Sequence, residues 1–296
     1  MIAEPLPSYH PAPSRPRLRL PALACDSHAH VLGPRARFPF AKGRSATPAD
    51  APKERLFALH ERLGIERGIV VQPACHGYDN FVTTEAIAAK GGAYRGVALV
   101  PADVPRNELR RLDALGFCGA RIDFSLQRTS MEKAAALTAR LAEVGWHLRV
   151  HLESSLIEEL GARLRHSPVP VLIEHMGRID ASPGAEQPAF RALLQLMENE
   201  RFWVEVSGAV PLARVLVARY GNRVLWGTRW PHQDVETPPD DGRLVDLLSE
   251  IAPGEAQLQA LLVRNPQRLF RFVDERRFLS HKSSALIGLS PRPSMR

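Results

Sequence analysis

The sequence predicts a single (β/α)8 barrel of class α/β, a TIM barrel. Three observations support this: eight short runs rich in Val, Ile and Leu, amphipathic helical patterns between them, and glycines directly after several of those patterns. Runs that lack a polar–apolar alternation are typical of parallel strands buried on both faces. A regular alternation of such strands with helices favours a closed barrel.

The eight strands are expected where the apolar runs lie. They are Leu23–Val31, Arg67–Pro73, Tyr94–Pro101, Gly119–Phe124, His147–Glu153, Pro170–His175, Phe202–Ser207 and Arg223–Gly227. An open doubly wound sheet is the alternative, and it is disfavoured because no Gly-x-Gly-x-x-Gly follows the first strand.

Helices are expected where apolar residues recur every three to four positions. Clear examples are Pro52–Leu63, Glu108–Leu115, Met131–Val144, Leu156–Arg165, Phe190–Met197, and finally Leu244–Ile251 and Gln257–Leu262, which would close the ring. Gly64, Gly116 and Gly145 follow three of these patterns. Glycine is favoured there because the residue after a helix often adopts a left-handed conformation.

The length of 296 residues fits one large barrel or two average domains, so the strand pattern decides the domain organisation. Residues 1–21 contain six prolines and are expected to form an extended arm, because proline removes a backbone donor and disfavours helix before it. Residues 22–272 are expected to form the barrel, and residues 273–296 a basic tail.

The net charge of +7 is carried mainly by the two ends of the chain. Residues 1–20 hold three arginines against one glutamate, and residues 271–296 hold six basic against two acidic residues, which leaves +1 for residues 21–270. A nucleic-acid-binding face needs basic residues clustered on the folded surface. We therefore expect a small-molecule substrate rather than nucleic acid.

Cysteine usage and hydropathy suggest a cytoplasmic protein. Cys25, Cys75 and Cys118 are odd in number and lack a Cys-x-x-Cys spacing, so neither a disulfide framework nor a structural zinc site is expected. No apolar stretch has the length of about 18 residues that predicts a transmembrane helix. The proline-rich N-terminus also lacks the pattern of a secretory signal. No membrane partner is expected, and the sequence leaves a homo-oligomer open.

Three histidines are expected at the carboxyl ends of strands, where barrels of this kind place reactive side chains. Asp26-Ser27-His28-Ala29-His30 closes the first strand, and the one-residue gap puts His28 and His30 on the same face of an extended chain. Two such imidazoles can chelate a divalent ion or donate to a substrate carbonyl. His175 ends the sixth strand, where the alternative is a buried histidine bonded to a backbone carbonyl.

Other charged candidates lie in the fourth, fifth and eighth strands. Arg121 is a charge inside a buried strand and must pair either with a structural carboxylate or with an anionic substrate. His147 and His151 share one face of the fifth strand, with His147 at its start and His151 at the end that faces the site. Arg229 follows the eighth strand, where a hydrolase would want a carboxylate to accept the proton of water.

Over residues 22–270 the chain resembles the amidohydrolase superfamily, and within it the branch that includes 2-pyrone-4,6-dicarboxylate lactonase. The matching segments run in order along the chain: Asp26-Ser27-His28-Ala29-His30, Gln72 with His76-Gly77-Tyr78-Asp79-Asn80, Arg95-Gly96-Val97, Gly119-Ala120-Arg121, Gly145-Trp146-His147, Glu174-His175-Met176-Gly177-Arg178, Val206-Ser207-Gly208, Trp226-Gly227-Thr228 with Trp230-Pro231-His232, and Asn265-Pro266.

The resemblance implies hydrolysis of a lactone, ester or amide carbonyl by water. It implies that His28, His30 and His175 bind a metal or polarise the carbonyl. A divalent zinc or manganese ion and a metal-free site are both consistent with it. The substrate, a small carboxylated compound from aromatic catabolism, would be held by residues at the mouth: Arg121, His151, Arg229 and His76.

Four departures from the family pattern bear on activity. Arg229 stands at the position where the family has an aspartate after strand eight. A guanidinium is a permanent cation and cannot act as a general base. Ala46 and His151 stand where the lactonase has tyrosines. The arginine expected after Gly208 is absent. The set of side chains that would bind the carboxylates of the substrate is therefore incomplete, and whether Gln127 or Arg128 belongs to it stays open. Two hypotheses follow: a hydrolase for a carboxylated substrate, or a catalytically impaired relative that binds a small anion or a partner.

Overall fold

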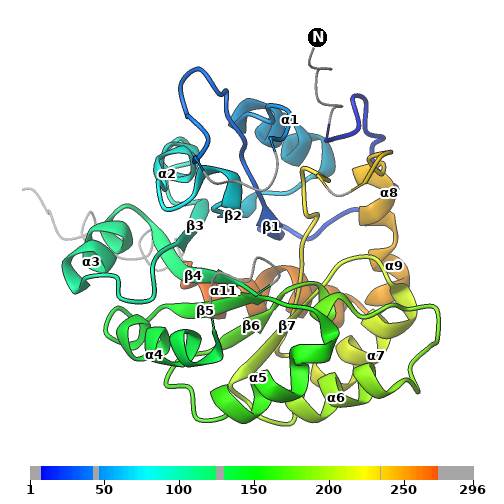
Figure 1. Ribbon diagram of the computed structural model, residues 1–296. Helices are drawn as coiled ribbons and strands as arrows, with labels where there is room; N and C mark the ends of the chain where they lie inside the picture. The colour runs from blue at the N-terminus through cyan, green and yellow to red at the C-terminus, as the bar shows by residue number, and fades with distance from the viewer. Residues whose placement is uncertain (1–7, 43–46, 125–129, 234, 273–296) are drawn as a thin grey trace, which may run out of the picture.

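The computed structural model describes residues 8–42, 47–124, 130–233 and 235–272, and within them the eight predicted strands form one parallel sheet. The strands pair in the order of the sequence (Figure 1): β1 (Cys25–Ala29), β2 (Arg67–Val71), β3 (Tyr94–Leu99), β4 (Phe117–Asp123), β5 (His147–His151), β6 (Val171–Ile173), β7 (Phe202–Val206) and β8 (Val224–Trp226). Ala46, Gln127, Arg128 and the tail 273–296 lie outside the described residues.

The ring closes between β1 and β8 through a short parallel contact at their carboxyl ends. Ala29 forms an isolated bridge with Trp230, the His30 amide donates to the Trp230 carbonyl at 2.7 Å, and the Arg229 amide donates to the His28 carbonyl at 2.9 Å. The (β/α)8 prediction is therefore confirmed, and the doubly wound alternative is wrong. The closure also brings His28 and His30 next to the segment that carries Arg229.

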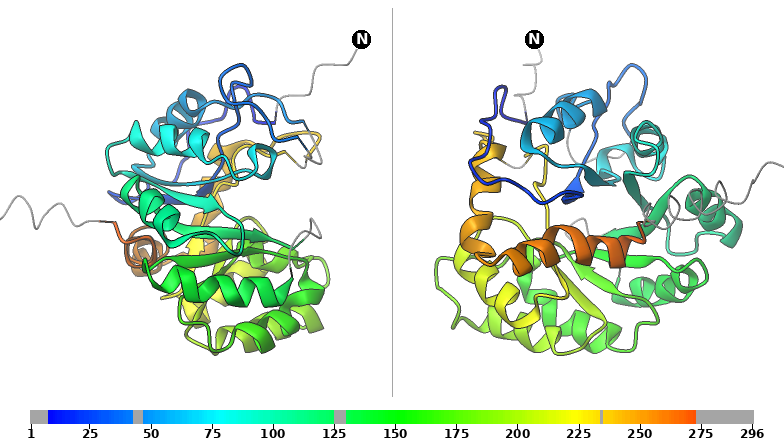
Figure 2. Two further views of the ribbon diagram at one scale, coloured as in Figure 1. Left: turned by 60° about the vertical axis from the view of Figure 1, so that its left-hand side comes forward. Right: turned by 180° about the vertical axis from the view of Figure 1, so that it is seen from behind.

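Helices surround the barrel and cover the outer face of the sheet (Figure 2). They are α1 (Lys53–Leu63), α2 (Phe81–Ala88), α3 (Arg106–Ala114), α4 (Met131–Ala142), α5 (Ile157–Leu164), α6 (Pro188–Met197), α7 (Val210–Tyr220), α8 (Asp241–Asp246), α9 (Leu248–Ile251), α10 (Glu255–Gln259) and α11 (Asn265–Phe270). The expected helix Leu244–Ile251 is divided between α8 and α9, and Gln257–Leu262 is divided between α10 and a π-helical turn, η4 (Ala260–Arg264). Helices α2, α7 and α11 are additions to the predicted examples.

Two buried clusters stabilise the fold. One fills the space between the sheet and the helices, and the other lies inside the barrel. The inner cluster holds Ile69, Val97, Leu172 and Leu225, together with Phe270 from α11. The last helix therefore completes the barrel core from the end where β5 begins, opposite the mouth with the three histidines.

Three glycines adopt the conformations that their positions after helices predict. Gly64, Gly116 and Gly145 have φ angles of 78°, 99° and 66°, so each adopts the predicted left-handed conformation. Residues 8–21 contain no helix or strand and run along α8, where the Arg17 and Leu18 amides donate to Asp246 at 2.7 and 2.9 Å. None of the described helices has the length and apolarity needed to cross a bilayer.

His147 lies at the amino-terminal start of β5, away from the mouth, as the sequence predicts. Its Nδ1 donates to the Cys118 carbonyl at 3.0 Å, and its ring packs on Phe270. Burial and then the positive charge of Arg149 lower the pKa of His147 to about 3. The folded protein therefore keeps this imidazole neutral at pH values where the unfolded chain protonates it.

The substitution His147→Asn tests this assignment, because an asparagine amide can donate to the same carbonyl but does not titrate. The wild type should lose stability as pH falls from about 6.5 toward 3, since the unfolded state binds more protons in that window. In the variant the free energy of unfolding should change less steeply with pH than in the wild type, by at most about 1.4 kcal/mol per pH unit. Urea unfolding at several pH values measures this, and equal slopes for both proteins would contradict the pKa of His147.

Candidate active site

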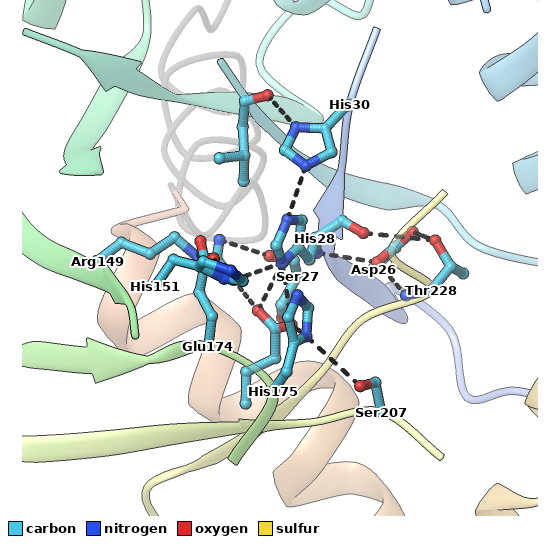
Figure 3. A network of polar contacts seen from close by, with 12 residues as sticks. Asp26, Ser27, His28, His30, Arg149, His151, Glu174, His175, Ser207 and Thr228 are labelled. Atoms are coloured by element: carbon cyan, nitrogen blue, oxygen red, sulfur yellow. Dashed lines mark hydrogen bonds and ion pairs between the residues drawn. The ribbon is translucent and has the colours of Figure 1, made fainter. Parts of the chain in front are cut away.

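The three histidines predicted from the sequence meet at the carboxyl-terminal mouth of the barrel (Figure 3). The Nε2 atoms of His28 and His30 lie 3.1 Å apart. The rings of His28 and His175 stack with their centroids 4.8 Å apart and an interplanar angle of 16°. Residues that are 145 and 147 positions apart in the chain thus form one cluster, because β1 and β6 end on the same side of the barrel.

The backbone after β6 turns sharply to present His175. His175, Met176, Gly177 and Arg178 have φ angles of 51°, 55°, 66° and 54°, so four successive residues have positive φ. This is why β6 ends at Ile173 instead of reaching His175 as predicted. Non-glycine residues in this conformation are uncommon and cost energy, and they gather at functional sites.

Asp26 holds the end of β1 against the segment after β8. Its carboxylate is completely buried and accepts from the amides of His28 and Thr228, both at 2.9 Å. It also accepts from the Thr228 hydroxyl at 2.6 Å and from His60 Nε2 at 3.1 Å. Four donors on one carboxylate fix the relative position of His28 and the backbone that leads to Arg229.

The Nδ1 atoms of the three imidazoles have acceptors that set the tautomers. His30 Nδ1 lies 2.7 Å from the Val71 carbonyl, which can only accept a hydrogen bond. His28 Nδ1 and His175 Nδ1 lie 3.0 and 2.9 Å from the carboxylate of Glu205. Each ring therefore donates from Nδ1, and its Nε2 carries a lone pair.

Glu205, in β7, is a site residue that the sequence analysis missed. It is completely buried and joins His28, His175 and the guanidinium of Arg149. The only sequence signal was a glutamate in the middle of an apolar strand, since a buried carboxylate must have partners. The same signal applied to Arg149 in β5, which also has no exposed surface.

Arg149 lies beneath the histidines and bridges two buried carboxylates. Its Nε lies 3.0 Å from Glu174 Oε1, its Nη2 contacts Glu205, and its Nη1 donates to the Ser27 carbonyl at 2.9 Å. Burial lowers the pKa of Arg149 to about 10, in spite of Glu174, so the group remains a cation at neutral pH. A fixed positive charge is therefore part of the floor of the site.

Glu174 is the second carboxylate of this network. It accepts from Arg121 Nε at 3.0 Å and Nη2 at 3.0 Å, and from His151 Nδ1 at 3.0 Å. Burial alone would raise the pKa of Glu174, but the nearby Arg121 cation outweighs it and leaves the pKa well below its usual value. Of the two pairings considered for Arg121, the structure contains the structural carboxylates: Glu174, and Asp123 at 3.1 Å.

The charges around the histidines keep all three imidazoles neutral. Burial and then Arg149 lower the pKa of His28, and burial and then Arg229 lower the pKa of His175. Burial and then Arg121 lower the pKa of His30 to about 4. Three arginines thus favour neutral imidazoles, which are the form that binds a metal or accepts a proton.

The family can be identified from comparison with known proteins. Residues 25–272 match the model of the family described as Amidohydrolase, which covers most of the chain and all eight strands. The chain belongs to the amidohydrolase family. It shares 38% identity with a 2-pyrone-4,6-dicarboxylate hydrolase of Comamonas testosteroni, over 88% of this chain and 94% of the relative. It shares 38% with a 4-sulfomuconolactone hydrolase of Hydrogenophaga intermedia, over 89% and 93%.

Solved structures share the barrel of this amidohydrolase. A putative 2-pyrone-4,6-dicarboxylic acid hydrolase from Pseudomonas putida superposes with a TM-score of 0.77 at 31% identity, over 86% of this chain and 99% of the other. A protein from Agrobacterium tumefaciens superposes with a TM-score of 0.79 at 27% identity, over 87% and 99%. Named hydrolases at 38% identity show that this chain is an enzyme. They do not favour the hypothesis of a catalytically impaired relative.

The remaining predicted residues occupy two different settings in this amidohydrolase. Arg229 is partly buried at the mouth with a φ of 64°, and its charge acts on His175. His76 is buried, and both of its ring nitrogens bond to backbone groups. Its Nδ1 donates to the Pro39 carbonyl at 3.2 Å, and its Nε2 accepts from the Gly33 amide at 3.3 Å. Both ring nitrogens of His76 therefore hold the loop after β1.

The donor set at the mouth fits a divalent ion. Two nitrogens about 2.0 Å from one tetrahedral zinc would lie ~3.3 Å apart. The Nε2 atoms of His28 and His30 are 3.1 Å apart with their lone pairs facing each other, which calls for a shared cation. One atom each of His28, Glu174 and His175 also lie within 4.8 Å of one another. Glu174 already accepts several strong hydrogen bonds, so the imidazoles are the better donors.

The substitution Glu205→Gln tests the anchoring role of this carboxylate. It should reduce the free energy of unfolding by about 3–5 kcal/mol, because Arg149 then loses a buried counter-charge. Denaturant unfolding of the purified variant measures the loss. Glu200→Gln, at an exposed site just before β7, is the matched control and should stay within about 0.5 kcal/mol of wild type. Equal stability of the two variants would contradict the role of Glu205.

Proposed function

We propose that this amidohydrolase hydrolyses the ring ester of a small lactone that carries at least one acid group. The observation that carries the proposal is the cluster of three neutral imidazoles: His28 meets His30 at Nε2 and stacks on His175, whose ring feels the cation of Arg229. A neutral imidazole can accept the proton of a water that attacks a carbonyl, and a guanidinium can bind an anionic group. Relatives named as hydrolases of an acidic pyrone and of a sulfonated lactone support the same class of substrate.

The reaction can be written with the residues at the mouth. Water attacks the lactone carbonyl carbon, an Nε2 lone pair accepts its proton, and the ring C–O bond breaks. The leaving oxygen takes up that proton. The product is a hydroxy acid, or an enol acid where the leaving oxygen was attached to a carbon–carbon double bond. Glu205 holds the Nδ1 protons of His28 and His175, so Nε2 remains the acceptor in both rings. Arg229 would stabilise the negative charge that develops on the carbonyl oxygen or the acid group of the substrate.

Zinc or manganese is the ion we propose for the same lone pairs, with His28, His30 and His175 as ligands. When bound, such an ion would polarise the carbonyl as a Lewis acid. Arg229 stands where the family resemblance expects a carboxylate, and a guanidinium nearby repels a divalent cation. We therefore infer that the affinity of this site for the ion is weaker than in relatives that have the aspartate.

Steady-state assays with 2-pyrone-4,6-dicarboxylate and 4-sulfomuconolactone test the proposed function. The wild type should hydrolyse at least one of them, and His175→Ala should lower kcat by about 100-fold or more, because an Nε2 lone pair is lost. His166→Ala, at an exposed histidine after α5, is the matched control and should leave kcat unchanged. Turnover that appears only after Arg229→Asp would show that the wild type is impaired and would overturn the proposal.

Elemental analysis of the purified protein tests the effect of Arg229 on metal binding. We expect less than one zinc or manganese per chain in the wild type and a higher content in Arg229→Asp, because the substitution replaces a repelling cation by a ligand. Both proteins are dialysed against the same metal buffer before measurement. A full equivalent in the wild type would contradict the expected weakening.

A further inference from the structure

Residues 8–21 of the N-terminal arm lie beside α8 and reach the segment that follows β8 (Figure 1). The Tyr9 ring packs on the ring of Trp230, with the centroids 5.4 Å apart and an interplanar angle of 38°. One residue earlier, the Ser8 carbonyl accepts from the His232 amide at 2.5 Å. Ser8 and Trp230 are both buried. The arm therefore packs directly against the loop from which Arg229 extends.

The arm is fixed to two helices along its length. The Ser14 amide donates to Asp240 Oδ1 at 2.9 Å at the start of α8, and Arg62 Nε of α1 donates to the Pro13 carbonyl. The arm also passes so close to α8 that a Cβ atom at Gly242 would lie 2.2 Å from the Ser14 carbonyl oxygen. Atoms that are not bonded to each other do not approach that closely. Any larger residue at position 242 would therefore push the arm away from α8.

Arg229 has a backbone conformation that needs support from its surroundings. Its φ of 64° lies in the left-handed region, which is strained for a residue with a side chain and persists only where neighbouring contacts determine it. From β1, the His28 carbonyl accepts from the Arg229 amide, and the His30 amide donates to the Trp230 carbonyl. The arm adds the packing of Tyr9 on the Trp230 ring. Contacts with β1 and with the arm together hold the segment.

His232 connects the same segment to α8. Its Nε2 lies 2.9 Å from Asp241 Oδ1 in the first turn of that helix, while its amide donates to the arm at Ser8. The side chains of His232 and Asp241 are both largely buried. His232 belongs to a segment on which the family resemblance rests, but the proposed reaction does not use it. In the structure it joins the arm, the segment after β8 and α8.

We propose that Tyr9 is a positioning residue: by packing on Trp230 it fixes the direction in which the side chain of Arg229 leaves the backbone at the mouth of the barrel. Tyr9 acts through Arg229 and not by contact with the reacting atoms. The inference rests on the proposed function for its effect on catalysis, and adds that the arm completes the active site. A displacement of about 1 Å in an active site can lower the rate about 100-fold, so the loss of this support should be measurable.

A double-mutant cycle between Tyr9→Ala and Arg229→Met tests whether the two residues act together. Tyr9→Ala should lower kcat/KM for 2-pyrone-4,6-dicarboxylate or 4-sulfomuconolactone, whichever is hydrolysed faster, by about tenfold, because Arg229 is no longer held in place. In the Arg229→Met background the same substitution should change kcat/KM less than about twofold, because effects that act through one residue are not additive. Tyr9→Phe keeps the ring and should retain most of the activity. An equal loss in both backgrounds would indicate a merely structural role and overturn the proposal.

Gly242→Ala displaces the arm from a position outside the mouth. It should reproduce the loss of kcat/KM in Tyr9→Ala, because the new methyl group collides with Ser14. Alanine favours a helix more than glycine does, so α8 itself should not be weakened. Arg15→Ala, at an exposed arginine of the same arm, is the matched control and should leave kcat/KM unchanged. Full activity of either Gly242→Ala or Tyr9→Ala would contradict the role of the arm.

Amide hydrogen exchange separates failure of this inference from failure of the proposed function, because it does not depend on turnover. The exchange of residues 229–232 should be about tenfold faster or more in Tyr9→Ala than in the wild type, since the local opening of this segment becomes easier. Exchange of β4 is the internal reference and should not change. If exchange responds in this way but the wild type hydrolyses no lactone, the arm positions the segment and the proposed function fails. Unchanged exchange at residues 229–232 would overturn the inference, even with altered activity.

Discussion

The site depends on one buried cation, the guanidinium of Arg149 inside the barrel. It has no exposed surface and lies between the carboxylates of Glu174 and Glu205, which are equally buried. Charges without water are stable only when they are paired and hydrogen-bonded. Because Arg149 pairs with Glu205, that carboxylate remains an acceptor that fixes two imidazoles. The histidines are thus held by electrostatics as much as by the strands that carry them.

The closure of the ring gives the site its second constraint. The strands β1 and β8 share only a short contact, and the carboxylate of Asp26 supplements it by accepting from both sides of the seam. His28 and Arg229 lie directly beyond this junction. The hydrogen bonds that close the barrel between β1 and β8 therefore also set the position of His28 relative to Arg229. The stability of this contact and the geometry of the site are coupled.

Arg229 stands where the family resemblance expects a carboxylate, and the barrel and its histidine cluster are nevertheless formed. His28 still meets His30 at Nε2 and stacks on His175, and the burial and neighbouring cations that lower the pKa values of the three rings keep them neutral. With Arg229 the charge that acts on His175 is positive, and a positive charge repels cations and attracts anions.

The sequence by itself determined the order of strands and helices, because burial on both faces leaves a readable apolar pattern, and it placed His28, His30 and His175 at one end since parallel strands all end there. It could not decide the partner of Arg121, nor predict Glu205 and Arg149. These side chains meet across strands far apart in the chain, 56 residues in the case of Arg149 and Glu205. Only the closed tertiary structure removes water from them and so compels the pairing.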